Sequence, residues 1–238
     1  MPLSMTIDEM VDDLRRNNYC HAVDFRELIH YSLQDESDFK RHWDRLVLDE
    51  NYKSYTRRER RLLLYRFRFG QPLEIDRNTE FTPTAVYDVD YTPGVNRLTY
   101  AEDSFIECQI LSQLLAADIR ILDGKLARGK EYTIDIHLFR ILSEDGAVSP
   151  TTSGNHQDGL DWVFMHFIDS RNIEPVVSEI HAEKESEGPL FAKALNEFLE
   201  TVIVNDRVLY HSANAVQQAR PDVLAYRDML LVSFSENK

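Results

Sequence analysis

The sequence predicts an α+β protein in which helices precede an antiparallel β-sandwich or barrel. Helical periodicity of apolar residues dominates residues 1–60, whereas strand-like alternation and continuous apolar runs dominate from about residue 131 onward. Between these parts, residues 104–123 have a strong apolar helical face, which we expect to pack on a sheet. Helices followed by a run of strands are typical of α+β folds. No repeat or linker divides the 238 residues, so we expect a single domain, with a helical layer over 1–60 and a β-rich core over about 62–238.

Two capping boxes mark predicted helix starts. Thr6 and Glu9 have the Thr-x-x-Glu spacing in which each side chain binds a backbone N–H group that the first helical turn leaves without a partner. Ser104 and Glu107 repeat this spacing, and Gly124 is a helix stop signal. The expected helices cover residues 6–17, 24–33, 37–48, 104–123 and 191–200.

Strands are predicted where apolar residues alternate with polar ones or run without interruption. Tyr65, Phe67 and Phe69 alternate with arginines, as in a half-buried strand. Asn205 and Asp206 are expected to form a tight turn between two later strands. The expected strands cover residues 62–70, 132–142, 160–168, 201–204, 207–211 and 226–234.

Charge and composition exclude several classes of function. Acidic residues outnumber basic ones by 41 to 27, which gives a formal charge of −14 and disfavours nucleic acid and anionic membranes as partners. No apolar run approaches the roughly 20 residues needed to cross a bilayer, and the N-terminus lacks the pattern of a secretion signal. Cys20 and Cys108 are the only cysteines, and we expect them to be thiols in a reducing cytoplasm.

A histidine stands two residues before an acid in three places. On a strand, residues two apart project to the same face and can share an ion, whereas on a helix they diverge by about 200°. His42 falls in a helical, charge-rich segment, and His181 falls in an acidic stretch that favours a solvated loop. The third pair precedes a strongly apolar strand, where a loop meets a sheet, and is therefore the metal-site candidate. The three pairs are His42–Asp44, His181–Glu183 and His156–Asp158.

His211 is the best candidate for a third ligand beside His156 and Asp158, because it ends a neighbouring predicted strand. His137 and His166 lie inside apolar strands, where a core residue or a residue that supports a ligand is the simpler interpretation. Two histidines and one carboxylate on one side of an ion suit non-haem Fe(II) with open positions for oxygen and a co-substrate. Zinc in a hydrolase can use similar ligands, so the residue types alone leave both metals open.

Arg227 favours the oxygenase interpretation. If strands 207–211 and 226–234 form a hairpin, Arg227 returns near the metal, where a guanidinium can bind a substrate carboxylate through two hydrogen bonds. The alternative is a surface arginine paired with Asp228 or another acid.

Three blocks of sequence resemble a known family. HQDGLDWVFMHF, VNDRVLYHS and YRDMLLVSF are similar to the signature blocks of the bacterial 2-oxoglutarate/Fe(II) dioxygenase family. That family includes free L-amino-acid hydroxylases of the L-isoleucine type and a biofilm-stress protein group. The likeness extends through IHLFRI and, more loosely, PGVNRLTYAEDSF, and so covers about the C-terminal 150 residues.

The resemblance implies a fold, a ligand set and a reaction. The fold would be a double-stranded β-helix of the jelly-roll or cupin type, flanked by helices. His156, Asp158 and His211 would bind Fe(II), and Arg227 would hold the distal carboxylate of 2-oxoglutarate. With O2 as second co-substrate, the enzyme would hydroxylate a small molecule, most simply a free L-amino acid, and release succinate. A peptide or specialised metabolite as substrate, or a metal-binding sensor without catalysis, stay open as alternatives.

The chain departs from the family pattern in two places. Residues 172–186 lack the usual Gly-Gly pair, so a loop near the site is expected to differ, and with it the substrate. Met229 stands two residues after the co-substrate arginine, where related oxygenases often place a serine, so a hydroxyl partner must come from elsewhere. For the substrate's own charged groups, Arg97, Arg140 and Asp161 are the candidates in or near the matching blocks.

Overall fold

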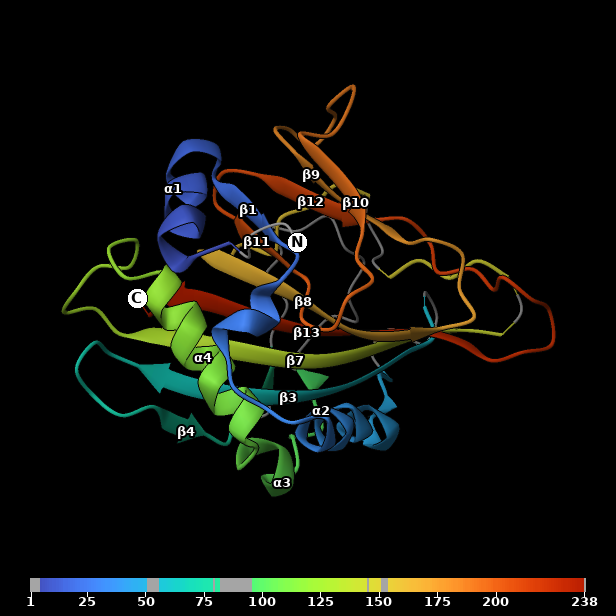
Figure 1. Cartoon of the computed structure of the whole chain (residues 1–238), viewed down its shortest axis with the longest axis horizontal. Helices are drawn as coiled ribbons and strands as arrows, with labels where there is room; N and C mark the ends of the chain where they lie inside the picture. The colour runs from blue at the N-terminus through green and yellow to red at the C-terminus, as the bar shows by residue number, and fades with distance from the viewer. Residues whose placement is uncertain are drawn as a thin grey trace.

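The computed structural model describes residues 5–50, 56–78, 80–81, 96–144, 146–150 and 154–237. Within these ranges an antiparallel sheet of eight strands forms the centre of the molecule (Figure 1). Its strands follow the order β1-β11-β8-β13-β7-β3-β2, and β4 also pairs with β3. The strands are β1 (Tyr19–Ala22), β2 (Val47–Leu48), β3 (Arg58–Phe67), β4 (Glu74–Asp76), β7 (Tyr132–Ser143), β8 (Trp162–Arg171), β11 (Thr201–Asn205) and β13 (Ala225–Glu236).

A smaller sheet covers one face of the large one. It has the order β10-β9-β12 and comprises β9 (Val177–His181), β10 (Phe191–Ala194) and β12 (Tyr210–Ala213). Ile180 of the small sheet packs in one apolar cluster with Met165 and Met229 of the large sheet, so the space between the sheets is a core. Two further short strands, β5 (Glu80–Phe81) and β6 (Asn96–Arg97), pair with each other.

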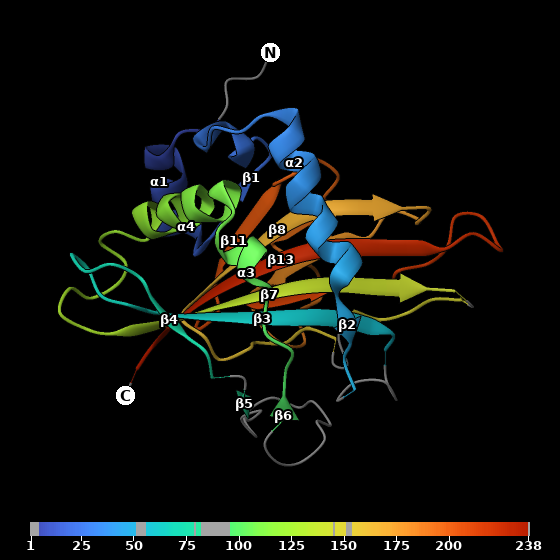
Figure 2. The same ribbon diagram turned by 90° about the horizontal axis from the view of Figure 1, so that it is seen from below.

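Helices cover the opposite face of the large sheet, as Figure 2 shows for α1, α2 and α4. Leu114 of α4 is fully buried in a large apolar cluster with Ile136 of β7 and Leu230 of β13. No helix in the described ranges is long and apolar enough to cross a membrane. The helices are α1 (Ile7–Asn17), α2 (Leu33–Lys40), α3 (Asp103–Ile106) and α4 (Gln109–Ile121), with 3-10 turns η1 (Phe25–Leu28) and η2 (Arg41–Arg45).

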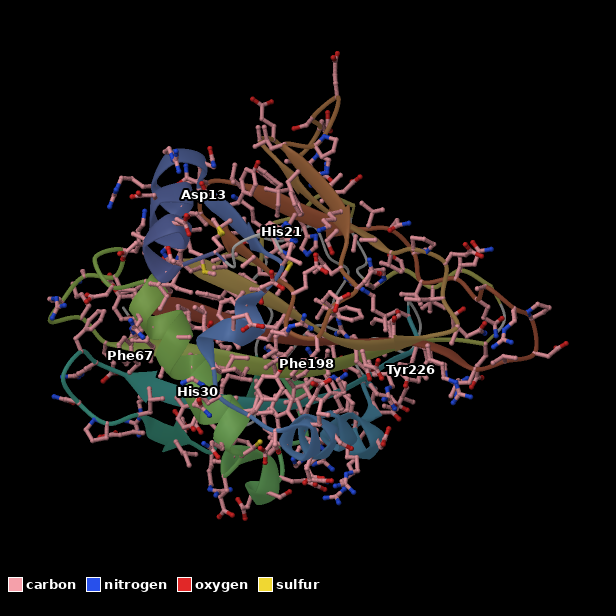
Figure 3. The ribbon with its side chains drawn as sticks, in the orientation of Figure 1. Asp13, His21, His30, Phe67, Phe198 and Tyr226 are labelled. Carbon is pink, nitrogen blue, oxygen red and sulfur yellow. The ribbon has the colours of Figure 1, made fainter. Side chains whose placement is uncertain are left out.

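Alternation along each long strand divides its side chains between the two cores. In β13, Leu230 and Val232 face the helices, whereas Met229 and Leu231 face the small sheet. We call the side of the large sheet that faces the small sheet its inner face. Two antiparallel sheets that enclose a core, with helices outside, form the double-stranded β-helix that the resemblance implied. In Figure 3, Phe67 and Tyr226 lie near opposite ends of the large sheet.

The predicted helix over residues 191–200 is wrong. Phe191–Ala194 is the edge strand β10, antiparallel to β9, and the chain then turns at Leu199, which has a φ of 60°. The buried Glu200 carboxylate holds this turn by accepting hydrogen bonds from the backbone N–H groups of Asn196 and Glu197. Pairing with a neighbouring strand has therefore overridden the local helical pattern.

The predicted helices of the first half need smaller corrections. Only one 3-10 turn, η1, forms within 24–33, and α2 begins before the predicted position because Ser32 and Asp35 make its capping box. The single helix expected over 104–123 is divided into α3 and α4, and neither N-cap, Glu102 nor Cys108, makes a side-chain cap. By contrast, the first helix begins and ends as predicted.

Removing the cap of α1 should cost a small, measurable amount of stability. The Thr6 hydroxyl accepts a hydrogen bond from the Glu9 N–H, and the Glu9 carboxylate accepts one from the Thr6 N–H. Thr6→Ala should therefore lower the free energy of unfolding by about 1 kcal/mol in urea denaturation. Thr6→Ser keeps the hydroxyl and should retain most of the stability. An equal loss in both variants would show that the cap does not stabilise the helix.

Candidate metal centre and co-substrate site

The loop before β8 and the small sheet bring together the three predicted ligands. His156 and Asp158 lie just before β8, and His211 is the second residue of β12. His156 and His211 exchange two backbone hydrogen bonds, of 3.0 and 2.9 Å, and their ring centroids are 4.4 Å apart. One ligand atom from each of the three side chains lies within 4.8 Å of the other two. The spacing is that of a group able to share one ion.

Both imidazoles turn the same nitrogen toward the carboxylate. His156 Nε2 lies 3.7 Å from Asp158 Oδ1, and His211 Nε2 lies 3.4 Å from Asp158 Oδ2. The opposite nitrogens face acceptors: His156 Nδ1 is 3.1 Å from the Gly154 carbonyl, and His211 Nδ1 is 3.4 Å from Asp206 Oδ1. With Nδ1 carrying the proton, each Nε2 lone pair points into the centre. A donor set of two neutral imidazoles and one carboxylate fits Fe(II).

The electrostatics of the three ligands favour a bound cation. Burial opposes charge on His211, but the carboxylates of Asp158 and Asp206, each 3.4 Å from one ring nitrogen, outweigh this and raise the pKa of His211 to about 10. For Asp158, burial is likewise outweighed, and the neighbouring histidines hold its pKa well below the usual range. Burial and the nearby His211 lower the pKa of His156. The negative charge that keeps a proton on His211 in the absence of an ion also attracts a divalent ion, which would take the place of that proton on Nε2.

Arg227 does not lie in the predicted hairpin. β12 and β13 lie in different sheets, so they do not form a hairpin. Arg227 instead projects from the inner face of β13, where it is 5% exposed, and its Nη2 donates a hydrogen bond of 3.1 Å to Ser178 Oγ on β9. Ala213, two residues after His211, is the register partner of Ser178. Diagonal neighbours of this kind are about 7–8 Å apart, so the residue that Arg227 contacts lies on the strand next to His211.

The Ser178 hydroxyl contacts Arg227, although Met229 stands where related oxygenases often have a serine. Related oxygenases often place a serine on the same strand as the arginine, and here the hydroxyl comes from the facing sheet. Burial lowers the pKa of Arg227 to about 10, which leaves the guanidinium charged at neutral pH. The predicted alternative, a surface arginine paired with Asp228, is wrong, because Asp228 lies on the opposite face of β13 and pairs with Arg140.

A comparison with known families decides where the chain belongs. Residues 40–233 match the family model described as 2OG-Fe dioxygenase. The chain belongs to this family. The dioxygenase therefore uses Fe(II), 2-oxoglutarate and O2, and the group of His156, Asp158 and His211 is a ligand set of the matching kind.

Solved structures share the fold of the dioxygenase over almost its whole length. IDO from Bacillus thuringiensis superposes with a TM-score of 0.82 at 16% identity, covering 100% of this chain and 99% of that chain. A bsmA homolog from Methylobium petroleophilum PM1 gives 0.84 at 20% identity, covering 99% and 95%. The Fe(II)/α-ketoglutarate-dependent dioxygenase TqaL gives 0.74 at 17% identity, covering 96% and 86%. No curated protein matches the chain in sequence.

The predicted substrate residues lie apart from the metal ligands or outside the described side chains. Arg140 projects from the helix-covered face of β7 and pairs with Asp228 at 2.8 Å through two nitrogens. Both carboxylate oxygens of Asp161 are engaged, one by Arg207 at 2.9 Å and the other by a backbone N–H at 2.7 Å. Arg97 belongs to β6, whose side chains fall outside the described part of the dioxygenase.

His166 and His137 lie in different cores. His166 is fully buried on the helix side, where its Nδ1 lies 2.7 Å from Thr201 Oγ1 and its Nε2 3.4 Å from Asp118, in agreement with a core role. His137 lies on the inner face and stacks on Phe139, with ring centroids 5.5 Å apart. His181 is not in a solvated loop as predicted, because it is the last residue of β9 and is 5% exposed.

Asp206 is a further residue of the candidate metal centre, and the sequence analysis did not predict it. It is 1% exposed, its Oδ2 accepts a hydrogen bond of 2.9 Å from the Leu160 N–H, and its Oδ1 faces His211 Nδ1. A buried carboxylate in this place sets the tautomer and orientation of the ligand histidine. The available signal in the sequence is its place in the predicted turn, five residues before His211.

Asp206→Asn should weaken metal binding without unfolding the protein. The amide keeps an oxygen for the Leu160 N–H but loses the negative charge that orients and strengthens His211 as a ligand. We expect the Kd for Mn(II), measured by calorimetry, to rise about 10- to 100-fold. Asp161→Asn, at a neighbouring carboxylate that contacts no ligand histidine, is the control and should bind Mn(II) normally. Equal affinities in the Asp206→Asn variant and the unmodified protein would contradict the orienting role.

Proposed function

We propose that His156, Asp158 and His211 hold the iron of this dioxygenase and that Arg227 binds the distal carboxylate of 2-oxoglutarate. One observation carries the proposal: Arg227 crosses the core from the large sheet to Ser178 on the small sheet, beside the strand that carries His211. A buried guanidinium with a hydroxyl neighbour suits a dicarboxylate whose other end chelates a metal.

Each residue of the centre has a physical task in this proposal. The Nδ1 partners, Gly154 and Asp206, orient the two imidazoles so that Nε2 is the nitrogen that would bind the ion. Arg227 and Ser178 fix the co-substrate so that its keto-acid end meets the ion in one orientation. The apolar side chains between the sheets, such as Met165 and Met229, exclude water from the reacting carbon. Iron with oxygen and 2-oxoglutarate supplies the oxidising power for C–H hydroxylation.

We further propose that the substrate is a free L-amino acid. The resemblance of the three signature blocks to amino-acid hydroxylases supports this assignment. IDO and the bsmA homolog share the fold of this chain, each over at least 95% of its own chain. Residence in a reducing cytoplasm stays a prediction from the cysteines, both of which are free thiols.

Succinate release across a substrate panel tests the proposed function. The protein, loaded with Fe(II) under air with 2-oxoglutarate, should release succinate well above its basal rate with at least one of the twenty L-amino acids. The hydroxylated product should appear by mass spectrometry in equal amount. Turnover only with peptides or other metabolites would replace the amino acid by another substrate. No binding of 2-oxoglutarate in the presence of Fe(II) would leave a metal-binding sensor instead of an oxygenase.

A further inference from the structure

Asn172 follows the end of β8 and has a backbone conformation that few side chains adopt. Its φ is 52°, in the left-handed region, which asparagine tolerates better than most residues other than glycine. It is the first residue of the stretch 172–186, which lacks the Gly-Gly pair of the resembled family. A glycine would adopt this conformation without strain but has no side chain. The contacts of the Asn172 amide therefore distinguish this turn from a glycine turn.

Both ends of the Asn172 amide bind the loop that joins β12 to β13, which we call the 214–224 loop. Nδ2 donates to the carbonyls of Arg220 at 3.0 Å and Val223 at 2.8 Å, and Oδ1 accepts from the Arg220 N–H at 3.1 Å. The Asn172 carbonyl accepts a further bond of 3.0 Å from the Ala219 N–H. We call these four hydrogen bonds the loop clamp. Three of them need the side-chain amide.

Neighbouring contacts support the loop clamp. Ile173 forms an antiparallel bridge with Gln218, and the Glu174 N–H donates to the Gln217 carbonyl at 2.8 Å. Gln218 Nε2 donates to the Val223 carbonyl, also at 2.8 Å, and so binds the loop to itself. The chain that leaves β8 and the chain that enters β13 are therefore joined over several residues at this end of the sheets.

The clamped loop contributes a buried side chain to an apolar cluster. Val216 is fully buried and belongs to one cluster with Ile141 and Val176. Its backbone also exchanges two hydrogen bonds of 2.8 Å with Val148. Figure 1 shows the loop in orange-red, beyond the end of the large sheet at which β13 begins. The part of the loop around Val216 is thus packed and paired with the body of the protein.

This apolar cluster lies beside the proposed co-substrate contact. Ile141 of β7 is the register partner of Arg227, and the side chains of register partners project to the same face, with Cβ atoms about 4.5–5.5 Å apart. Val176 stands two residues before Ser178, which accepts the hydrogen bond from Arg227. The cluster therefore includes a neighbour of each partner in the contact between Arg227 and Ser178.

We propose that Asn172 is a positioning residue for 2-oxoglutarate, because it holds the loop whose Val216 packs beside Arg227. This inference rests on the proposed function, in which Arg227 binds the distal carboxylate. A guanidinium that binds a carboxylate through two hydrogen bonds needs a fixed orientation, and close packing of its neighbours supplies it. The ligand histidines are held by their own backbone hydrogen bonds, so the loop clamp should act on the co-substrate and not on the metal.

Asn172→Gly removes the amide and keeps the left-handed backbone. The three side-chain hydrogen bonds are lost, so the Kd of 2-oxoglutarate should rise on the order of 10-fold, measured by calorimetry with the anaerobic Fe(II) protein. The Kd of Mn(II) should be unchanged. In an assay of succinate release, the KM for 2-oxoglutarate should rise while kcat is unchanged, which is a split that a general loss of structure would not produce.

Two further variants separate the loop clamp from overall stability. Asn172→Asp keeps the size of the side chain and tolerates the same φ, but it replaces the Nδ2 donor by an oxygen that faces two carbonyls. Its Kd for 2-oxoglutarate should therefore rise at least as much as that of Asn172→Gly. Thr6→Ala, which removes the cap of α1, is the control for lowered stability and should bind 2-oxoglutarate normally.

Hydrogen exchange in the unmodified protein is a second measurement that needs no folded variant. If the loop packs beside bound 2-oxoglutarate, the co-substrate should slow the exchange of the backbone amides of residues 216–223 when Mn(II) is present. Mn(II) alone should leave these amides unchanged, because the loop does not carry a metal ligand. If the Asn172 variants do not fold, this measurement decides, and an unchanged exchange rate overturns the inference.

The outcomes distinguish this inference from the function on which it rests. Equal 2-oxoglutarate affinity in Asn172→Gly and the unmodified protein overturns the positioning role and leaves the proposed function standing. An equal loss of affinity in Thr6→Ala, or an equal loss for Mn(II), assigns the effect to general stability and overturns it too. If 2-oxoglutarate does not bind the unmodified protein, the proposed function fails and this inference with it. A selective rise in the Kd of 2-oxoglutarate supports the assignment.

Discussion

His211→Ala should abolish tight metal binding and, with it, the turnover of 2-oxoglutarate. The variant removes one of three ligands, and the carboxylate of Asp206 then faces an empty space instead of an imidazole. Loss of an outer partner of a ligand typically costs about 10- to 100-fold in affinity, so loss of the ligand itself should cost more than about 100-fold. Calorimetry with Mn(II) and an assay of succinate release measure the two consequences independently.

The matched control for this variant is His30→Ala. His30 is an exposed histidine on the N-terminal part of the chain (Figure 3), and its removal should change neither metal affinity nor turnover. If the His211→Ala variant kept the Mn(II) affinity of the unmodified protein while folded, the ion would have to be bound elsewhere. The ligand set inferred from the fold would then be wrong.

Arg227→Ala should remove 2-oxoglutarate binding and leave metal binding intact. The guanidinium is buried, and a buried, hydrogen-bonded charge pair that loses one partner costs about 2–5 kcal/mol. At the middle of this range the Kd for 2-oxoglutarate rises on the order of 100-fold or more. A titration of 2-oxoglutarate into the anaerobic Fe(II) protein measures this change, and a preceding Mn(II) titration shows whether the metal site is preserved.

Two further variants show whether the shape of the guanidinium matters as well as its charge. Arg227→Lys keeps a positive charge but loses the planar fork, so its affinity should lie between those of Arg227→Ala and the unmodified protein. Arg171→Ala is the control, because Arg171 is an exposed arginine on β8 opposite Tyr226. An unchanged 2-oxoglutarate affinity in Arg227→Ala would assign the co-substrate to another cation.

The long strands of the large sheet were predictable because their patterns are strong and local. β7, β8 and β13 lie within three residues of their predicted ends. β8 and β13 have continuous buried runs in which apolar residues dominate, whereas buried and half-buried residues alternate along most of β7. Both patterns indicate a strand without knowledge of its neighbours. The His156–Asp158 pair was also predictable, since a polar turn before a buried strand places side chains at the rim of a sheet.

Features that depend on distant partners were not predictable from one sequence. Phe191–Ala194 has a helical local pattern, but it forms a strand because it pairs with β9. Ser178 and Arg227 lie in different sheets, and their separation along the sequence does not predict the hydrogen bond between them. Arg58 and Arg60 are a further example, because they belong to a charged run that is typical of a solvated face, whereas the sheet buries both of them.

Thermal unfolding under anaerobic conditions tests the central claim most directly. Ligands that bind only the native state stabilise it, by about 2.7 kcal/mol at a concentration of 100 times Kd, which corresponds to about 5–10 °C for a chain of this size. Fe(II) should raise the Tm of the unmodified protein, and 2-oxoglutarate should add a second increment only when Fe(II) is present. Arg227→Ala should keep the first increment and lose the second. A second increment that survives in Arg227→Ala, or one that appears without metal, would contradict a co-substrate held between that arginine and the ion.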